Sequence, residues 1–343
     1  MRKLLNTLYI TTPDAYLALE GENVVVKKDD ENIMRVPLHN LEGIVSFGYT
    51  GASPALMGEC AERGIYLSFC TAYGRFIADV RGETHGNVYL RRIQYRMADD
   101  ETQCINVVKN LLIGKLHNSR WVLERATRDY ADRLDVERVK RSAQLVADSI
   151  KYILSAETYE TLIGVEGEAA SQYFSVFDEL ILHNKDAFYF RERNRRPPLD
   201  NVNALLSFMY TILSHDVSSG LSSVGLDPFV GFLHKDRPGR RSLALDIMEE
   251  LRAPLVDRFV LTLINTRQIN GGDFEKRESG AVYCKDNARK TILAAWQTRK
   301  NEKIVHPFLN EKIEWGLVPH VQALLLARFL RGDLDEYPPF LWK

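Results

Sequence analysis

The spacing of hydrophobic residues changes near residue 100 of this 343-residue chain. Before that point, short runs of β-branched and aromatic residues such as "NVVVKK" and "EGIVSFG" alternate with charged turn segments, which predicts short β-strands. After it, stretches such as "CINVVKNLLIGKLHNSRWVLERA" carry an apolar residue every three or four positions, which predicts helices. We therefore predict an α+β fold, with a small β-sandwich-like N-terminal domain over residues 1–90, a linker over residues 91–100 and a larger all-α domain over residues 101–343.

One helix is expected inside the β-rich part. Ser53 suits the N-cap position, Pro54 suits the first helical position, and Gly64 suits the position after the last helical residue, Arg63. These residues predict a single helix between two strands.

The composition is that of a globular protein, with 45% hydrophobic and 27% charged residues. No apolar run reaches the roughly 18 residues of a membrane-spanning helix, and polar residues interrupt the N-terminal stretch "MRKLLNTLYITT". We therefore expect a cytoplasmic protein with no membrane partner. The four cysteines lack the spacing of a zinc site and are expected to be buried thiols.

The basic residues form local clusters although the formal net charge is only −1. A nucleic-acid-binding protein of this charge must therefore rely on such clusters. The residues that we expect to contact phosphate groups are Arg195 and Arg196, which precede a Pro-Pro pair, and Lys235, Arg237, Arg240 and Arg241 of the segment "HKDRPGRR". The alternatives are a solvated loop and ion pairs with the protein's own acids.

An acidic arc follows His234 and its basic loop. The predicted helix "SLALDIMEELRAPLVDRFVLTLI" has an apolar stripe, and its opposite arc carries Asp246, Glu249, Glu250 and Asp257. Hard divalent cations prefer carboxylate oxygens and accept an imidazole nitrogen, so this combination suits a metal site. A solvated acidic helix face is the alternative.

Glu166 lies between two glycines in "GVEGE", at the expected start of a helix. Flanking glycines would allow the close backbone approach that a metal–phosphate site needs, whereas a glutamate favoured by the helix dipole is the alternative. No nucleophile elbow, zinc-protease motif or phosphate-binding glycine loop is present.

Three segments together resemble the CRISPR adaptation integrase family, the spacer-acquisition endonuclease and integrase of CRISPR systems. They are "GVEGEAASQYF", "RRPPLDNVNALLSFMYT" and "GLDPFVGFLHKDRPGRRSLALDIMEELRAPLVDR", in the family's order, and the length and wording resemble a type I-C system. The resemblance implies that Glu166, His234 and Glu249 are the catalytic residues and hold Mg²⁺ or Mn²⁺. Asp246 would be a supporting acid and Glu250 a salt-bridge partner.

The resemblance also implies a reaction and partners. A 3′-hydroxyl of a short DNA fragment would attack a phosphodiester at the repeat, which inserts the fragment into the CRISPR array as a new spacer. The implied partners are double-stranded DNA (the protospacer fragment and the CRISPR repeat), a second copy that forms a homodimer, and a small ferredoxin-like adaptation protein. We expect the β-rich domain to make the homodimer contact, because it offers strand edges and aromatic residues. A metal-dependent DNA nuclease that uses water and a non-catalytic nucleic-acid scaffold stay open as alternatives.

Overall fold

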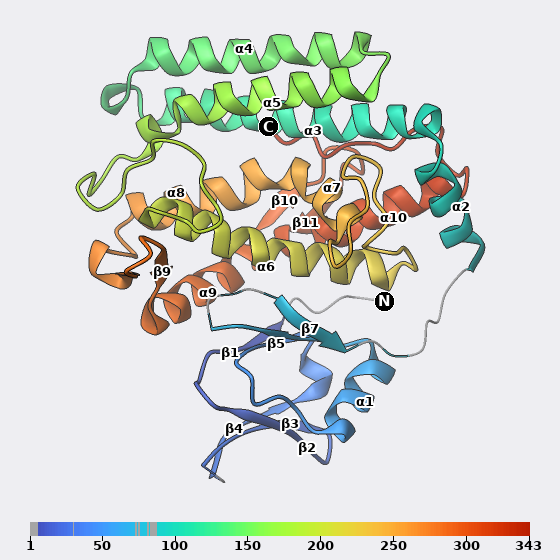
Figure 1. Cartoon of the computed structure of the whole chain (residues 1–343), viewed down its shortest axis with the longest axis vertical. Coiled ribbons are helices and arrows are strands. Elements are labelled where there is room, and N and C mark those ends of the chain that lie inside the picture. Colours follow the sequence, from blue (N-terminus) through green and yellow to red (C-terminus); the bar gives the residue numbers. More distant parts are fainter. Residues whose placement is uncertain (1–5, 30, 73, 75, 81, 83–87) are drawn as a thin grey trace. The chain divides into compact units, whose positions relative to one another are not determined.

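The computed structural model describes residues 6–29, 31–72, 74, 76–80, 82 and 88–343. The chain forms two compact units, one from the described part of residues 1–85 with Cys284–Glu302, and one from the described part of residues 86–283 with Lys303–Lys343 (Figure 1). The prediction of a β-rich N-terminal part followed by a mainly helical part is confirmed. No helix within the described ranges is long and apolar enough to cross a membrane.

The first unit contains two β-sheets. Its strands are β1 (Thr7–Ile10), β2 (Tyr16–Glu20), β3 (Asn23–Lys28), β4 (Glu31–Pro37), β5 (Gly43–Phe47), β6 (Tyr66–Cys70) and β7 (Phe76–Val80). One sheet has the order β1-β5-β6-β7, in which β5 pairs parallel to both β1 and β6, while β7 pairs antiparallel to β6. The other is the antiparallel sheet β2-β3-β4. The parallel pairs are possible because α1 and the second sheet supply the crossover connections.

Both sheets contribute to one hydrophobic core, as a sandwich requires. Leu17 and Val24 from the antiparallel sheet belong to the same buried cluster as Ile44 and Leu67 from the mixed sheet and Leu56 from α1. This burial removes apolar surface from water and is the main force that holds the two sheets together.

The predicted helix is present as α1 (Pro54–Arg63). Ser53 Oγ accepts a 3.2 Å hydrogen bond from the Leu56 N–H, and Gly64 ends the helix with φ +67°. The unit also includes α9 (Asp286–Asn301), a segment that the predicted boundaries assigned to the helical domain.

The second unit is mainly helical. Its helices are α2 (Val88–Ala98), α3 (Glu101–Asp129), α4 (Val136–Ser155), α5 (Tyr159–Ser175), α6 (Asn201–Ser223), α7 (Ser242–Leu251), α8 (Arg258–Asn265) and α10 (Val318–Leu330). Its short strands are β8 (Phe274–Lys276), β9 (Val282–Cys284, whose last residue belongs to the first unit), β10 (Lys303–Val305) and β11 (Lys312–Glu314), so the part expected to be all-α also has two two-stranded sheets. The segment expected to be a linker is largely helical, because it falls on α2.

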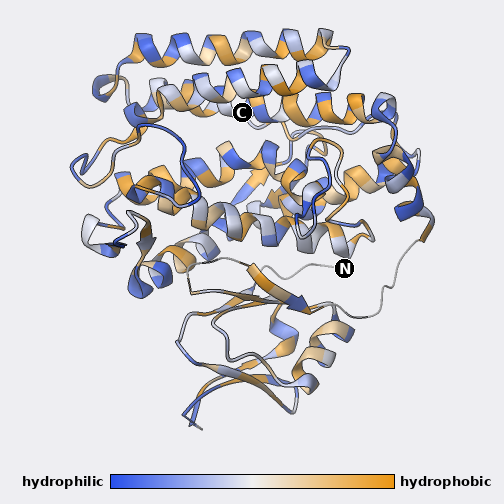
Figure 2. Ribbon diagram, in the orientation of Figure 1, coloured by the Kyte–Doolittle hydropathy of each residue, from blue (hydrophilic) through white to orange (hydrophobic). Residues whose placement is uncertain are grey.

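The helices of the second unit pack in layers. In Figure 1, α3, α4 and α5 lie side by side, and α6, α7, α8 and α10 lie below them. Figure 2 shows hydrophobic and hydrophilic residues alternating along these helices, as expected for helices with one buried face. Helix α3 also packs against α7, and the candidate site described below lies between these two helices and α5.

The helix predicted from residue 242 to residue 264 is interrupted. α7 ends at Leu251, a π-helical turn spans Arg252–Asp257, and α8 follows. Pro254 has no N–H to donate to the carbonyl four residues earlier, so regular α-helical bonding cannot continue through it.

The acidic arc of this segment is buried, which contradicts the alternative of a solvated face. The exposed fractions are 0% for Asp246, 4% for Glu249, 0% for Glu250 and 1% for Asp257. Buried carboxylates need hydrogen bonds or cations as partners, so each of these four has a specific environment.

Candidate metal and nucleic-acid site

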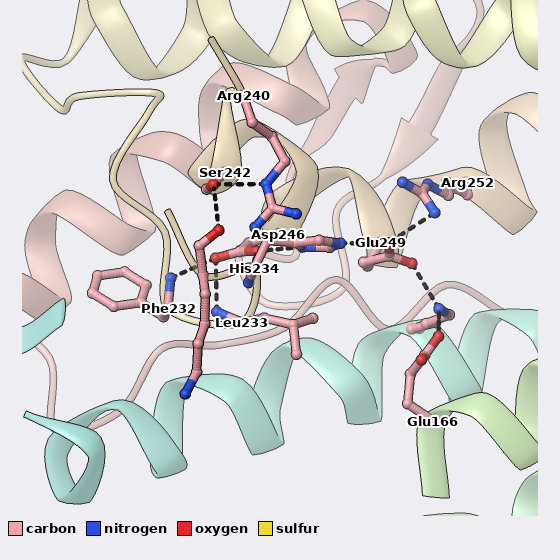
Figure 3. A network of polar contacts seen from close by, with 11 residues as sticks. Glu166, Phe232, Leu233, His234, Arg240, Ser242, Asp246, Glu249 and Arg252 are labelled. Atoms are coloured by element: carbon pink, nitrogen blue, oxygen red, sulfur yellow. Dashed lines mark hydrogen bonds and ion pairs between the residues drawn. The ribbon is translucent and has the colours of Figure 1, made fainter. Parts of the chain in front are cut away.

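Asp246 organises the loop that precedes α7. Its Oδ2 accepts hydrogen bonds from the backbone N–H groups of Phe232 at 2.6 Å and Leu233 at 3.0 Å. Its Oδ1 accepts the N–H of His234 at 2.9 Å (Figure 3). A Cβ at Gly231 would lie 2.8 Å from Asp246 Oδ2, so the close wrapping of the loop requires glycine there. Three successive N–H groups on one buried carboxylate fix the backbone at His234.

The same carboxylate sets the tautomer of His234. Asp246 Oδ1 lies 2.7 Å from His234 Nδ1, and an ionised carboxylate can only accept, so Nδ1 carries the proton. In the neutral ring Nε2 then carries the lone pair, and it lies 3.9 Å from Glu249 Oε1. This is the arrangement of metal-binding histidines, in which a carboxylate holds one ring nitrogen and the other binds the ion.

Glu249 lies between two cationic side chains. Its Oε1 is 2.8 Å from Arg252 Nη1, and its Oε2 is 2.8 Å from Lys115 Nζ. Burial opposes ionisation of this carboxyl, but Arg252 and Lys115 outweigh burial and lower its pKa to about 2. Glu249 is therefore a buried carboxylate that stays ionised.

Lys115 of α3 joins Glu249 to Glu166 of α5. Its ammonium also makes an ion pair with Glu166 Oε1, and its side chain is only 15% exposed. Burial lowers the pKa of Lys115, but the two carboxylates outweigh burial and the net shift is upward. The sequence analysis missed this residue, although Lys115 follows the buried Leu111 by one helical turn and so lies on the apolar side of α3.

Glu166 lies in the interior of α5 and not at its start. The helix begins after the N-cap Thr158, so the dipole alternative fails because that effect is confined to the first turn. A Cβ at Gly164 or Gly167 would meet nothing within 4 Å, so the helix surface beside Glu166 is open.

Glu249 is therefore linked to Glu166 through Lys115 and lies beside His234, but the three residues expected to hold a metal do not form a ready ligand set. Within the described ranges, no group of three or more His, Cys, Asp or Glu side chains is placed to hold an ion. Two carboxylates and an imidazole nitrogen suit Mg²⁺ or Mn²⁺ chemically, and Glu166 and Glu249 already share one cation, the Lys115 ammonium. The carboxylate and imidazole donors therefore suit a divalent cation, and in this structure the Lys115 ammonium lies between the two carboxylates.

Glu250 is not the salt-bridge partner that was expected. Its Oε2 accepts the Phe340 N–H at 2.6 Å, and its Oε1 accepts from Gln322 Nε2 at 3.1 Å and from the Tyr337 hydroxyl. Burial raises the pKa of Glu250 to about 7. Glu250 therefore anchors the C-terminal segment behind Glu249.

A second buried cluster lies beyond Arg252. Asp257 accepts hydrogen bonds from Tyr210 at 2.6 Å and Tyr173 at 2.9 Å, and burial raises its pKa to about 6. The guanidinium of Arg252 lies 5.1 Å from the centre of the Tyr210 ring and that of Arg193 lies 5.4 Å from it. This cluster, which the sequence analysis also missed, holds the Arg252 guanidinium over the Tyr210 ring.

The predicted phosphate-binding residues have different environments. Exposed residues are Arg195, Arg196, Lys235 and Arg237, whereas Arg240 is half-buried and Arg241 is buried with 8% exposure. Lys235 lies 3.3 Å from Glu101, which matches the alternative of an ion pair with the protein's own acids. Arg240 Nε donates to Ser242 Oγ at 3.3 Å. Arg195, Arg196 and Arg237 are the best placed to meet a phosphate.

Comparison with known proteins decides the family. A family model described as "CRISPR associated protein Cas1" matches residues 8–298. The chain is 51% identical to "CRISPR-associated endonuclease Cas1 1" of Chlorobaculum tepidum and 52% identical to "CRISPR-associated endonuclease Cas1 2" of Rhodospirillum rubrum, in each case over 100% of both chains. This chain belongs to the CRISPR-associated Cas1 family.

Solved structures show the same fold as this Cas1 family member. A casposase bound to its integration product has a TM-score of 0.84 at 20% identity and covers 98% of this chain and 94% of its own. A CAS1 protein from Thermotoga maritima has a TM-score of 0.80 at 21% identity, with 95% and 97% covered. At these identities the likeness concerns the fold alone.

Proposed function

We propose that this chain is a metal-dependent DNA endonuclease and integrase that inserts short DNA fragments into a CRISPR array by 3′-hydroxyl transesterification. The observation that carries the proposal is that Glu166 and Glu249 share the Lys115 ammonium, while His234, held by Asp246, has its Nε2 3.9 Å from the same Glu249 carboxylate. The full-length relatives named as CRISPR-associated endonucleases support the endonuclease part of this proposal.

Glu166, His234 and Glu249 would hold Mg²⁺ or Mn²⁺. Such an ion activates an attacking hydroxyl and offsets charge on phosphoryl oxygens when it is bound. The protein's own contribution is orientation: Asp246 holds His234 Nδ1, so that Nε2 points towards Glu249. The attacking hydroxyl belongs to DNA, so no nucleophilic side chain is needed.

The partners are part of the proposal. Double-stranded DNA, as protospacer fragment and repeat, would meet Arg195, Arg196 and Arg237. The structural neighbours described as a casposase bound to an integration product and as a "Cas6-RT-Cas1–Cas2 complex" support DNA and a small adaptation protein, which we propose to be ferredoxin-like, as partners. We further propose a homodimer through the β-rich unit and a type I-C system.

The test is an integration assay on a supercoiled plasmid that carries the repeat. Fragments with a 3′-hydroxyl should be joined to the plasmid when Mg²⁺ or Mn²⁺ is present, and fragments with a 3′-deoxy end should not. Glu166→Gln, His234→Asn and Glu249→Gln should each abolish joining. Cleavage without joining would support the water-using nuclease, and DNA binding without either reaction would support the scaffold.

A further inference from the structure

The position of Lys115 raises the question of how a divalent cation enters the site. Lys115 Nζ is paired with Glu249 Oε2 at 2.8 Å and with Glu166 Oε1, and these are oxygens that an ion between the two carboxylates would use. Within the described part of the chain, Lys115 is the only cation paired with Glu166, whereas Glu249 also has Arg252. Among the residues that the structure describes, Lys115 is therefore the cation that links the two carboxylates.

The charge balance argues against a site that holds the ion and Lys115 together. Glu166, Glu249 and the Asp246 carboxylate behind His234 carry three negative charges, and Lys115 and Arg252 carry two positive charges, so the cluster has a net charge of −1 with a neutral imidazole. A divalent ion added to it would leave one uncompensated positive charge among groups of which Glu249 is only 4% exposed and Lys115 15% exposed, and the departure of one cation would restore the balance. Unpaired charge in such a site is costly, so one cation must leave.

Lys115 is better suited to leave than Arg252. A lysine ammonium is a single charge on a flexible stem of four carbons, whereas the Arg252 guanidinium is also held over the Tyr210 ring. Lys115 is attached to α3, and movement of its side chain requires no change in that helix.

We propose that Lys115 is a built-in, displaceable cation: it pairs the two carboxylates when no metal is bound, and a divalent ion must displace it to bind. This inference rests on the proposed function, because it takes Glu166 and Glu249 as metal ligands. Lys115 then keeps the metal-free site ordered and at the same time weakens metal binding. Removal of its charge should have opposite effects on these two properties.

The test compares Lys115→Met with the wild type by Mn²⁺ titration, with free Mn²⁺ followed by electron paramagnetic resonance. We expect the Mn²⁺ dissociation constant to fall about 10-fold, within the range of 5–150-fold that is usual for coupling between two binding events. The metal-free variant should unfold at a lower temperature, and saturating Mn²⁺ should raise its Tm by more than that of the wild type. Lys115→Arg keeps the charge and should bind Mn²⁺ as the wild type does.

Lys109→Met is the matched control, because Lys109 is on the same helix and its ammonium donates to the Leu154 carbonyl at 3.1 Å, with no carboxylate partner among the described residues. It should leave Mn²⁺ binding unchanged. If Lys115→Met cannot be isolated without metal, Lys115→Gln, which retains a polar end, gives the same comparison.

The outcomes separate this inference from the proposed function. An unchanged or weaker Mn²⁺ affinity in both Lys115→Met and Lys115→Gln would overturn the displacement role while the metal site itself stands. Absence of Mn²⁺ binding by the wild type, or binding that Glu249→Gln does not weaken, would instead overturn the metal site of the proposed function.

Discussion

The side-chain amide of Asn118 donates a 2.6 Å hydrogen bond to the backbone carbonyl oxygen of Glu250. That carbonyl lies four residues before Pro254, which has no N–H to offer it. The Asn118 amide also donates to the Phe340 carbonyl at 2.7 Å and accepts from the Trp342 N–H at 2.8 Å. One side chain of α3 therefore holds both the end of α7 and the C-terminal segment, directly behind Glu249.

Asn118→Ala should lower the free energy of unfolding by about 2–4 kcal/mol, because it removes three buried hydrogen bonds and leaves their partners unsatisfied. Urea unfolding measures this loss. Asn110→Ala is the control, since Asn110 donates one bond, of 3.0 Å, to the Tyr337 carbonyl, and its loss should cost only about 1 kcal/mol. Equal losses in the two variants would contradict the bracing role of Asn118.

Glu250 should make the protein less stable as pH rises. Burial raises its folded-state pKa from 4.5 to about 7, so its contribution is fully favourable below pH 4.5 and is lost as pH rises through about 7. The full difference corresponds to about 3 kcal/mol. Urea unfolding of the wild type and Glu250→Gln from pH 5 to pH 8 should therefore show the wild type losing stability relative to the variant.

Other buried carboxyls do not confuse this measurement. Asp257, whose pKa burial raises to about 6, titrates in both proteins and cancels in the comparison. The pKa of Glu249, lowered to about 2, affects stability only as pH falls from about 4.5, below the range used. Parallel pH profiles for the two proteins would show that Glu250 does not titrate as described.

Gly231→Ala should disturb the loop that carries His234. The added Cβ would lie 2.8 Å from Asp246 Oδ2 and equally close to the Ser242 backbone, so we expect a loss of about 1–3 kcal/mol on urea unfolding and a large loss of integration. Gly167→Ala is the matched control beside Glu166, where a Cβ meets nothing within 4 Å. Because Gly167 is inside α5, this change should stabilise the protein by about 1 kcal/mol.

Removal of charge at Arg195 and Arg196 should weaken DNA binding and make it less sensitive to salt. Each lost phosphate contact lowers the slope of log affinity against log salt by about 0.9, so the double alanine variant should lose roughly two units of slope. Fluorescence anisotropy at several salt concentrations measures this slope. Arg241→Ala should instead lower stability, because Arg241 is buried. An unchanged slope in the Arg195 and Arg196 variant would remove these arginines from the DNA interface.

Alanine substitution of a proposed metal ligand would leave the fold intact if the site were exposed. Because Glu249 is buried, its alanine variant should instead destabilise the fold. Glu249→Ala would leave Lys115 and Arg252 without their buried carboxylate, and breaking a buried ion pair costs about 3–5 kcal/mol. This is the reason for choosing the isosteric Glu249→Gln in the integration assay.

The sequence alone determined the features that depend on residues close together along the chain. The change of hydrophobic period separated the strands from the helices, and local capping residues located α1, from Ser53 to Gly64, because both signals arise within a few residues along the chain. The three motifs, taken together in order, also pointed to the family, which full-length relatives now show.

The tertiary structure decided which side chains meet. Lys115 pairs with Glu166, 51 residues away, and Asn118 bonds to Glu250, 132 residues away, and no local pattern records such contacts. An amphipathic helix shows the same acidic arc whether water or a buried network faces it, so the burial of Asp246, Glu249 and Glu250 could not be read from periodicity. α3 packs against α7 and places the Lys115 ammonium against the Glu249 carboxylate. The C-terminal segment packs against the neighbouring Glu250.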